Sequence, residues 1–177
     1  MSTVMPSGMA GKSVAREIEE LFREHYQLVY RTAYGLLDNA SDAEDVLQTL
    51  FLRLLRREIP ADLKNIKGYL YRAAVNLSLD TVQARHRFEL VGNDKRFETA
   101  IDVSESRFAE QTHRRLAKAL AQLDPETVQI LVLRYVHDYS DADIAKLLGT
   151  SRGTIAVKLF RSRARLKKLM RESLGEQ

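Results

Sequence analysis

Proline placement limits what this chain can fold into more than any other feature. Only three prolines occur in 177 residues, at Pro6, Pro60 and Pro125, and each lies where a helix could begin or end. Proline lacks a backbone donor and interrupts helices, so the long stretches between these positions are free to be helical. No segment alternates apolar and polar residues as a half-buried strand does. The sequence therefore predicts the all-α fold class.

Apolar spacing in the first half predicts three helices. The first extends from about Ser13 to Leu37. A capping-box pattern that begins at Ser41 starts the second helix, which runs to about Arg57. Asn65 can cap the third helix. The predicted buried faces comprise Ile18, Leu21, Phe22, Leu28 and Val29 in the first helix, Ala43, Leu47, Leu50 and Leu54 in the second, and Ile66, Leu70, Ala73, Ala74, Leu77 and Thr81 in the third.

The second half carries clear signals for helix boundaries. Asp124 followed by Pro125 is an N-cap with proline in the first turn, and a second capping box begins at Ser140. Gly149 can supply the left-handed conformation that ends a short helix, and Ser151 can cap a last helix of about 20 residues. The predicted buried residues are Val128, Leu131, Val132 and Tyr135 after Pro125, and Ile155, Leu159, Ser162, Leu166, Leu169 and Met170 in the last helix.

Residues 88–108 separate the two helical halves. This segment lacks sustained periodicity and contains Gly92 and Asn93 as well as two serines, which are common in loops. We therefore predict a linker over residues 88–108 between two small helical domains, residues 13–87 and 109–173. A chain of 177 residues has room for two such domains.

Charge is segregated along the chain, although the net charge is only +4. Residues 144–171 hold nine lysines and arginines and no acid, and residues 64–87 hold five bases against one acid. Residues 38–45 hold four acids and no base. Two basic blocks separated by a mildly acidic stretch indicate two contacts with one polyanion. The alternative is that each block is the solvated face of a helix.

The last two predicted helices have the pattern of a helix-turn-helix. Ala145 is small where the helices would cross, and Ile144 and Ile155 are apolar where they would meet. The polar arc of the last helix suits the base edges and phosphates of a DNA major groove. The alternative is a basic amphipathic helix on a membrane surface or a partner protein. The arc comprises Thr154, Lys158, Arg161, Arg165 and Lys168.

The third predicted helix combines aromatic, basic and amide side chains. An exposed aromatic such as Tyr69 can stack on unpaired bases, while a cation such as Arg72 can hold phosphates. Asn76 offers a base edge both a donor and an acceptor, although asparagine is a poor helix former. The alternative is that Tyr69 and Tyr71 are ordinary core or boundary aromatics.

Several classes of function lack the residues they need. Cysteine is absent, which excludes disulfides, thiolate metal sites and cysteine nucleophiles. The four histidines are scattered, so we predict neither a metal site nor a cofactor. A nuclease or recombinase would need clustered carboxylates or a nucleophile, and the acids at Asp42, Glu44 and Asp45 have no nearby histidine, so we predict no enzyme activity. The absence of a long apolar run predicts a cytoplasmic protein without membrane insertion.

Three motifs together resemble a known family. Residues 42–54 (DAEDVLQTLFLRL) and 68–80 (GYLYRAAVNLSLD) resemble region 2 of bacterial RNA polymerase sigma factors of the sigma-70 family, and residues 123–166 are similar to region 4. The short linker between the regions is similar to that of the extracytoplasmic-function (ECF) group. The resemblance implies a dissociable subunit that binds core RNA polymerase, recognises the −35 and −10 promoter elements, melts DNA and starts transcription.

The resemblance also implies a role for each helix. The acidic second helix would bind the clamp helices of the largest polymerase subunit. The third helix and the preceding loop, residues 59–65, would read and open the −10 element, and the last helix would read the −35 element. An anti-sigma factor is a further partner that the resemblance implies. The implied residues are Asp42, Glu44, Asp45, Gln48, Phe51 and Leu52 for polymerase, Asp62, Lys64, Asn65, Tyr69, Arg72, Asn76, Arg85 and Arg87 for the −10 element, and Ser151, Arg152, Thr154, Lys158, Arg161, Arg163 and Arg165 for the −35 element.

Four positions depart from the family pattern. Tyr69 stands where Trp or Phe is usual, which preserves ring stacking, and Thr150 replaces an apolar turn residue. Gln83 and Lys158 stand where arginine is common, and lysine cannot make the bidentate guanine contact of arginine. The remaining alternative is a stand-alone helix-turn-helix transcriptional regulator with an N-terminal dimerisation or effector domain, which would bind DNA without polymerase.

Overall fold

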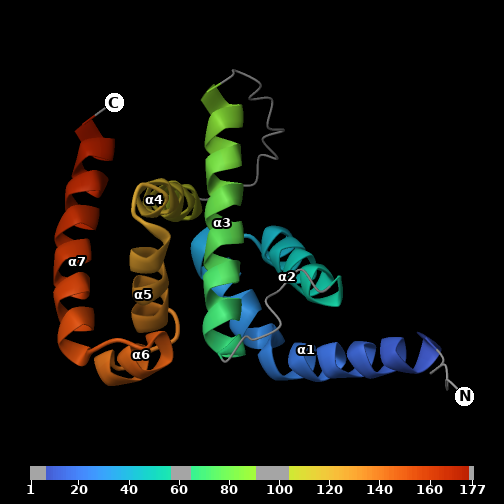
Figure 1. The fold of residues 1–177 in the computed structure, drawn as a ribbon. Coiled ribbons are helices and arrows are strands. Elements are labelled where there is room, and N and C mark those ends of the chain that lie inside the picture. The colour runs from blue at the N-terminus through green and yellow to red at the C-terminus, as the bar shows by residue number, and fades with distance from the viewer. Residues whose placement is uncertain (1–6, 57–64, 91–103, 176–177) are drawn as a thin grey trace, which may run out of the picture.

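Helices account for the regular structure of the described chain, and no strand occurs there (Figure 1). The computed structural model describes residues 7–56, 65–90 and 104–175. The predicted all-α class is confirmed. Within the described part, no helix is both long enough and apolar enough to cross a membrane. The helices are α1 (Ser7–Leu37), α2 (Ala40–Leu55), α3 (Ile66–Leu90), α4 (Ser104–Leu120), α5 (Pro125–Tyr135), α6 (Asp141–Leu148) and α7 (Arg152–Gly175).

The turn before α2 decides which residue caps that helix. Asp38 has a φ of 48°, a left-handed conformation that aspartate tolerates better than most residues. Asn39 follows in an extended conformation, and its Oδ1 accepts a hydrogen bond from the Asp42 backbone N at 3.0 Å. Asn39 is therefore the N-cap, and the prediction that Ser41 begins the capping box is wrong.

The helices on either side of the predicted linker are longer than the sequence predicts. α3 continues to Leu90 and α4 begins at Ser104, so both ends of the 88–108 segment are helical. Residues 91–103 lie outside the described residues. α1 is also longer than predicted, because it begins at Ser7. Local composition is a weak guide to a helix end, since the surrounding fold overrides residue propensity.

α5 lies between α3 and α7 and joins the two halves of the molecule (Figure 1). Asp124 caps this helix as predicted, because its Oδ1 accepts a hydrogen bond from the Thr127 backbone N at 2.9 Å. Burial raises the pKa of Asp124, but the hydrogen bonds from Thr127 outweigh it and hold the pKa below its usual value. The residues from Val128 to Leu133 are all buried, because α5 has neighbours on several sides. Tyr135 lies beyond this run and is 57% exposed, so its predicted burial is wrong.

The two halves share an apolar core. Tyr71, Val75 and Leu79 of α3 lie in one cluster of buried residues with Val128 and Leu131 of α5. Tyr71 is fully buried there, and its ring meets the His137 ring edge to face, with centroids 5.0 Å apart. The sequence predicted two domains joined by a linker, and the structure adds a packed contact between them.

A glycine allows the close approach of α1 to the end of α5. A Cβ atom at Gly35 would lie 2.9 Å from Cγ2 of Val136, a distance that side chains do not tolerate. Arg31, one turn earlier on α1, donates a hydrogen bond from Nη2 to the Val136 carbonyl oxygen at 2.9 Å. Glycine costs a helix about 0.5–1 kcal/mol relative to alanine, and here it permits this contact.

One buried side chain makes the contact between the halves less favourable. Gln129 of α5 is almost fully buried, and its Nε2 donates a long hydrogen bond of 3.4 Å to the Gly68 carbonyl oxygen of α3. Its Oε1 finds no hydrogen-bond partner in the part of the chain that the structure describes. An unpaired buried acceptor costs about 1–3 kcal/mol, so the packed halves are held together less tightly than a fully satisfied core would be.

His137 stays neutral within this contact. Thr32 Oγ1 donates to the Leu28 carbonyl oxygen at 2.8 Å, so it accepts from His137 Nε2, which lies 2.9 Å away. This arrangement assigns the ring proton to Nε2. Burial, followed by the positive charges of Arg31 and Lys67, lowers the pKa of His137 to about 4.

We expect the free energy of unfolding to fall as the pH drops from about 6.5 to about 4. The unfolded chain binds a proton on His137 near pH 6.5, whereas the folded chain resists it until the pH reaches about 4, so acid favours the unfolded chain. The loss due to His137 should be about 2–3 kcal/mol, measured by urea unfolding across this range. His137→Gln, which keeps a donor for Thr32, should flatten the dependence. The exposed control variant His86→Gln should leave the pH dependence unchanged. An equal effect of both variants would contradict the assignment of this dependence to His137.

Candidate nucleic-acid interface

The turn between α6 and α7 has the predicted helix-turn-helix construction. Ser140 and Asp143 form a reciprocal capping box at the start of α6, and the hydrogen bonds from Ser140 lower the pKa of Asp143. Gly149 ends α6 with a φ of 67°, which glycine adopts without strain. Ser151 Oγ then accepts a hydrogen bond from the Thr154 backbone N at 3.1 Å. Ser151 and Thr154 therefore hold the start of α7 while remaining exposed.

Apolar side chains pack together where α6 and α7 cross. Ile144 and Ile155 are completely buried, and Ala145 is buried beside them, as the sequence predicts. Leu159 and Ser162 continue the buried face of α7. The opposite side of α7 is consequently free to meet a partner.

The cations of α7 fall into two groups. Lys158, Arg161 and Arg165 line a hollow of about 350 Å³ beside the turn between α4 and α5. Arg163 lies on another side of the helix, where its Nε donates to the Leu159 carbonyl oxygen at 3.1 Å. The structure therefore brings three of the predicted −35 residues together and places Arg163 apart from them. Arg152, the first helical residue, is exposed.

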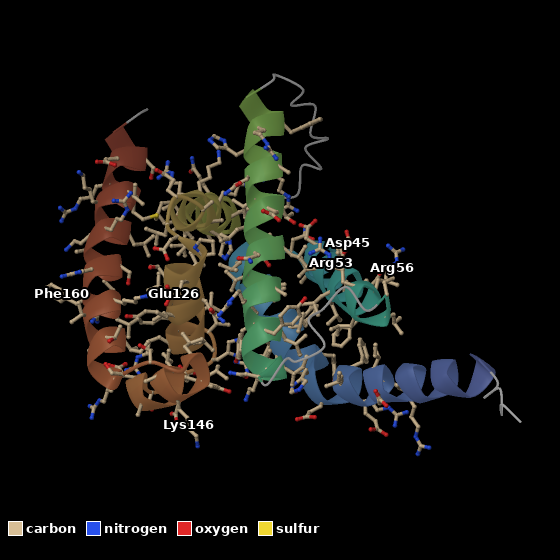
Figure 2. The ribbon with its side chains drawn as sticks, viewed as in Figure 1. Asp45, Arg53, Arg56, Glu126, Lys146 and Phe160 are labelled. Carbon is tan, nitrogen blue, oxygen red and sulfur yellow. The ribbon has the colours of Figure 1, made fainter. Side chains whose placement is uncertain are left out.

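An acid from another helix meets this cationic group. Lys158 Nζ lies 2.6 Å from Glu126 Oε1, and Glu126 comes from the first turn of α5 (Figure 2). Glu126 is not among the residues that the sequence predicts, because residues 32 positions apart give no local signal of contact. The ion pair partly neutralises one cation of the predicted reading helix.

The exposed polar residues of α3 form a stripe. Arg72, Asn76, Gln83 and Arg87 are exposed and recur at helical spacing, and we call them the α3 stripe. Tyr69 lies beside this stripe but is half-buried against the core of α1, α2 and α3. The stripe keeps two amide and two guanidinium groups accessible on one side of the helix.

Two other residues that are predicted to bind the −10 element instead contact other parts of the protein. Asn65 Oδ1 accepts from the Gly68 backbone N at 2.8 Å, which confirms the predicted cap, and its Nδ2 donates to the Leu147 carbonyl oxygen of α6 at 2.7 Å. Arg85 forms an ion pair with Asp42 of α2, which joins a residue predicted to bind DNA to one predicted to bind polymerase. These contacts hold α3 against α6 and α2. The predicted residues Asp62 and Lys64 lie outside the described residues.

α2 presents a mixed stripe, with acids at its start, apolar residues towards its end, and the exposed cations Arg53 and Arg56 on the same side (Figure 2). Asp45, Gln48, Leu52 and Leu55 follow one another at intervals of three or four residues, and all are exposed beside Glu44. We call these five residues the α2 face, and Figure 2 shows Asp45 on the side of α2 away from α7. Leu55 is not among the residues predicted to bind polymerase, although its spacing from Leu52 was a usable signal.

Phe51 supports this helix from inside. It is 6% exposed, and its ring meets Phe22 of α1 edge to face, with centroids 4.8 Å apart. The prediction that Phe51 contacts a partner is therefore not supported by its position, since the side chain faces the core. No group of histidine and acidic residues in the described ranges is arranged to hold a metal ion.

Comparison with known proteins places these faces in a family. A family model for sigma-70 region 2 matches residues 21–88, and one for sigma-70 region 4 matches residues 113–166. The RNA polymerase sigma-E factor of Streptomyces antibioticus is 32% identical over 152 residues, which cover 85% of this chain and 83% of that protein. The chain belongs to the ECF group of sigma-70 family sigma factors. The region 2 match contains the α2 face and the α3 stripe, and the region 4 match contains α6 and the first half of α7.

Other relatives of this sigma factor differ in length. The ECF sigma factor SigE of Mycolicibacterium smegmatis is 30% identical over 164 residues, which cover 89% of this chain but 63% of that protein. The chain therefore spans less than two thirds of that relative. A solved structure, the sigma factor RpoE of Bartonella quintana in complex with the anti-sigma factor NepR, is similar at 22% identity with a TM-score of 0.49, over 88% of this chain and 98% of that chain.

Replacing Glu126 by glutamine should strengthen DNA binding through Lys158. Removal of the carboxylate frees the ammonium group for a phosphate, so the salt dependence of binding should steepen by about one counterion. Fluorescence anisotropy of a duplex carrying the −35 element, titrated with the sigma factor at several salt concentrations, measures this slope.

Glu110→Gln is the matched control for this measurement. Glu110 pairs with Arg114 on α4 and lines a hollow with residues of α1 and α3, so its loss should leave the slope unchanged. A slope that Glu126→Gln fails to alter would mean that Lys158 does not meet a phosphate.

Proposed function

We propose that this sigma factor uses its three exposed faces for three partners. The α2 face binds core RNA polymerase, the α3 stripe opens the −10 element, and α7 reads the −35 element. Residues 13–87 and 109–173 act as the two functional domains. The observation that carries this proposal is that one chain presents a cationic helix after a capped turn and, on its other half, a helix face with acids at its start and exposed apolar residues towards its end.

The α2 face has the chemistry for a basic protein surface. Glu44 and Asp45 supply charge that guides association, while Leu52 and Leu55 supply apolar area for contact. A basic, partly apolar pair of polymerase helices would be complementary to this combination. Asp42 contributes indirectly, since its ion pair with Arg85 fixes α2 against α3. An anti-sigma factor remains a predicted partner.

The α3 stripe has the chemistry for an unpaired strand. Asn76 can donate to and accept from a base edge, while Arg72 and Arg87 can hold phosphates. A captured base would offset an unpairing cost of a few kcal/mol, so recognition and melting become one event. Asp62 and Lys64 would take part from the segment before α3, whereas Asn65 serves as the cap of α3. No chemical step by the protein is needed.

The packed halves must separate before both promoter elements are bound. Positions −35 and −10 are roughly 25 base pairs apart, which at about 3.4 Å per base pair is roughly 85 Å of duplex. α7 and α3 are separated by α5, and packed helices lie about 8–10 Å apart, so the two reading helices are only roughly 20 Å apart. The unpaired Oε1 of Gln129 lowers the cost of this separation. We infer that the described arrangement is the form of the free protein.

A disulfide between Gly35→Cys and Val136→Cys should lock the halves together. The Cβ position at Gly35 lies 3.6 Å from Cβ of Val136, within the range of about 3.5–4.5 Å that disulfides occupy. The natural chain has no cysteine, so no other bridge can form. The oxidised variant should lose transcription from promoters that need both elements by tenfold or more, and reduction should restore it.

The double variant Gly35→Ala/Val136→Ala controls for the altered packing without a crosslink. Its activity should be the same under oxidising and reducing conditions. Equal transcription from the oxidised and reduced cysteine variant would contradict the need for separation. Failure of the disulfide to form in the free protein would contradict the packed arrangement itself.

Transcription with purified core polymerase on a promoter library tests the proposed function directly. The sigma factor should select templates that share a −35 and a −10 element. Asn76→Ala should then reduce open-complex formation on duplex templates about tenfold, because its amide no longer holds a base. Permanganate reactivity of unpaired thymines near the −10 element measures this loss.

The exposed amide variant Gln111→Ala on α4 is the matched control and should keep wild-type reactivity. Wild-type permanganate reactivity in Asn76→Ala would remove this residue from strand capture. Tight, sequence-specific DNA binding without polymerase would instead favour a stand-alone helix-turn-helix regulator.

A further inference from the structure

Two large apolar side chains lie on the outer side of α7. Val157 is 48% exposed and Phe160 is 71% exposed. They are three residues apart and therefore neighbours on the helix surface. Figure 2 shows Phe160 on the side of α7 that faces away from α5. Single exposed apolar residues are common, but two adjacent large ones at the centre of a helix face indicate a contact surface.

The residues around this pair are small. Gly153, Ala156 and Ala164 are exposed on the same side of α7, opposite the buried Ile155. A Cβ atom at Gly153 would meet only the Ser151 Oγ at 3.8 Å, so open space lies over this position. Because the side chains around Val157 and Phe160 are small, a partner can approach the helix backbone closely there. We call Val157, Phe160 and these three small residues the apolar centre of α7.

Cations border the apolar centre on both sides. Arg161 and Arg165 lie along one edge, where they line the hollow beside the α4–α5 turn. Arg163 and Lys167 lie along the other edge, where they line a separate groove with Leu166. This arrangement accounts for the position of Arg163 apart from the other predicted −35 residues. An apolar centre between two cationic edges matches a major groove, which has phosphates along both walls and base edges on its floor.

Thymine offers the one apolar group on that floor. Its 5-methyl group projects into the major groove, and alanine, threonine methyl and phenylalanine side chains contact it in known complexes. We propose that Val157 and Phe160 contact thymine methyl groups of the −35 element and set the sequence preference of this sigma factor there. This proposal rests on the proposed function of α7. It also gives a reason why the helix tolerates two exposed apolar side chains.

Replacement of single thymines by deoxyuridine tests the proposal, because deoxyuridine lacks only the methyl group. The templates are −35 elements selected by the reconstituted holoenzyme, with each thymine replaced in turn. Loss of one buried methyl contact should lower transcription by the wild-type protein about fourfold at one or two positions. Phe160→Ala should be weaker on the thymine template and should show no further loss with deoxyuridine. Phe160→Leu should keep much of the methyl dependence.

Phe108→Ala is the matched control, because Phe108 is an exposed phenylalanine of α4 that lines neither of the two hollows beside α7. It should respond to deoxyuridine as the wild-type protein does. Wild-type transcription that is equal on thymine and deoxyuridine templates would overturn the proposal, as would selected −35 elements without thymine. An unchanged deoxyuridine effect in both Phe160→Ala and Val157→Ala would show that other residues contact the methyl groups. In each of these cases −35-dependent transcription persists, whereas its absence would contradict the proposed function.

Discussion

The packing of α5 against α1 and α3 is the contact on which the arrangement of the molecule depends. Gly35 lets α1 approach the end of α5, and Tyr71 fills the space between α3 and the residues that follow α5. α5 also supports α7 on its other side, so this one helix fixes the distance between α3 and α7. Because residues 128–133 of α5 are all buried, this contact cannot open without exposing apolar surface, and a partner that keeps the halves apart must compensate for that exposure.

The contact between the two halves also contains polar groups that destabilise it. Gln129 leaves an acceptor unpaired, and His137 must stay neutral in a pocket near two cations. Both features lower the stability of the packed arrangement relative to a purely apolar core. If the halves separate to reach both promoter elements, as we propose, a contact of this kind orders the free chain without holding it permanently closed.

Local signals predicted the helix starts well. Asp124 and Ser140 cap their helices as expected, and Gly149 has the left-handed conformation that the turn requires, because each of these effects involves residues within one turn. The cap of α2 was mispredicted, since the left-handed turn at Asp38 moves the cap to Asn39. The helical ends of the predicted linker were also missed, because weak periodicity there gives no information about helix length.

The predicted site residues also differ in how far local sequence, rather than tertiary packing, determines them. The sequence by itself determined the helical class, the helix-turn-helix and the stretches of charge, because periodicity, capping and composition are local properties. Only the tertiary structure decided which side chains stay available: it occupies Arg85 with Asp42, pairs Lys158 with Glu126 and turns Phe51 into the core. These contacts join residues far apart in the chain, and their free energy depends on the packing of whole helices, which no short stretch of sequence encodes.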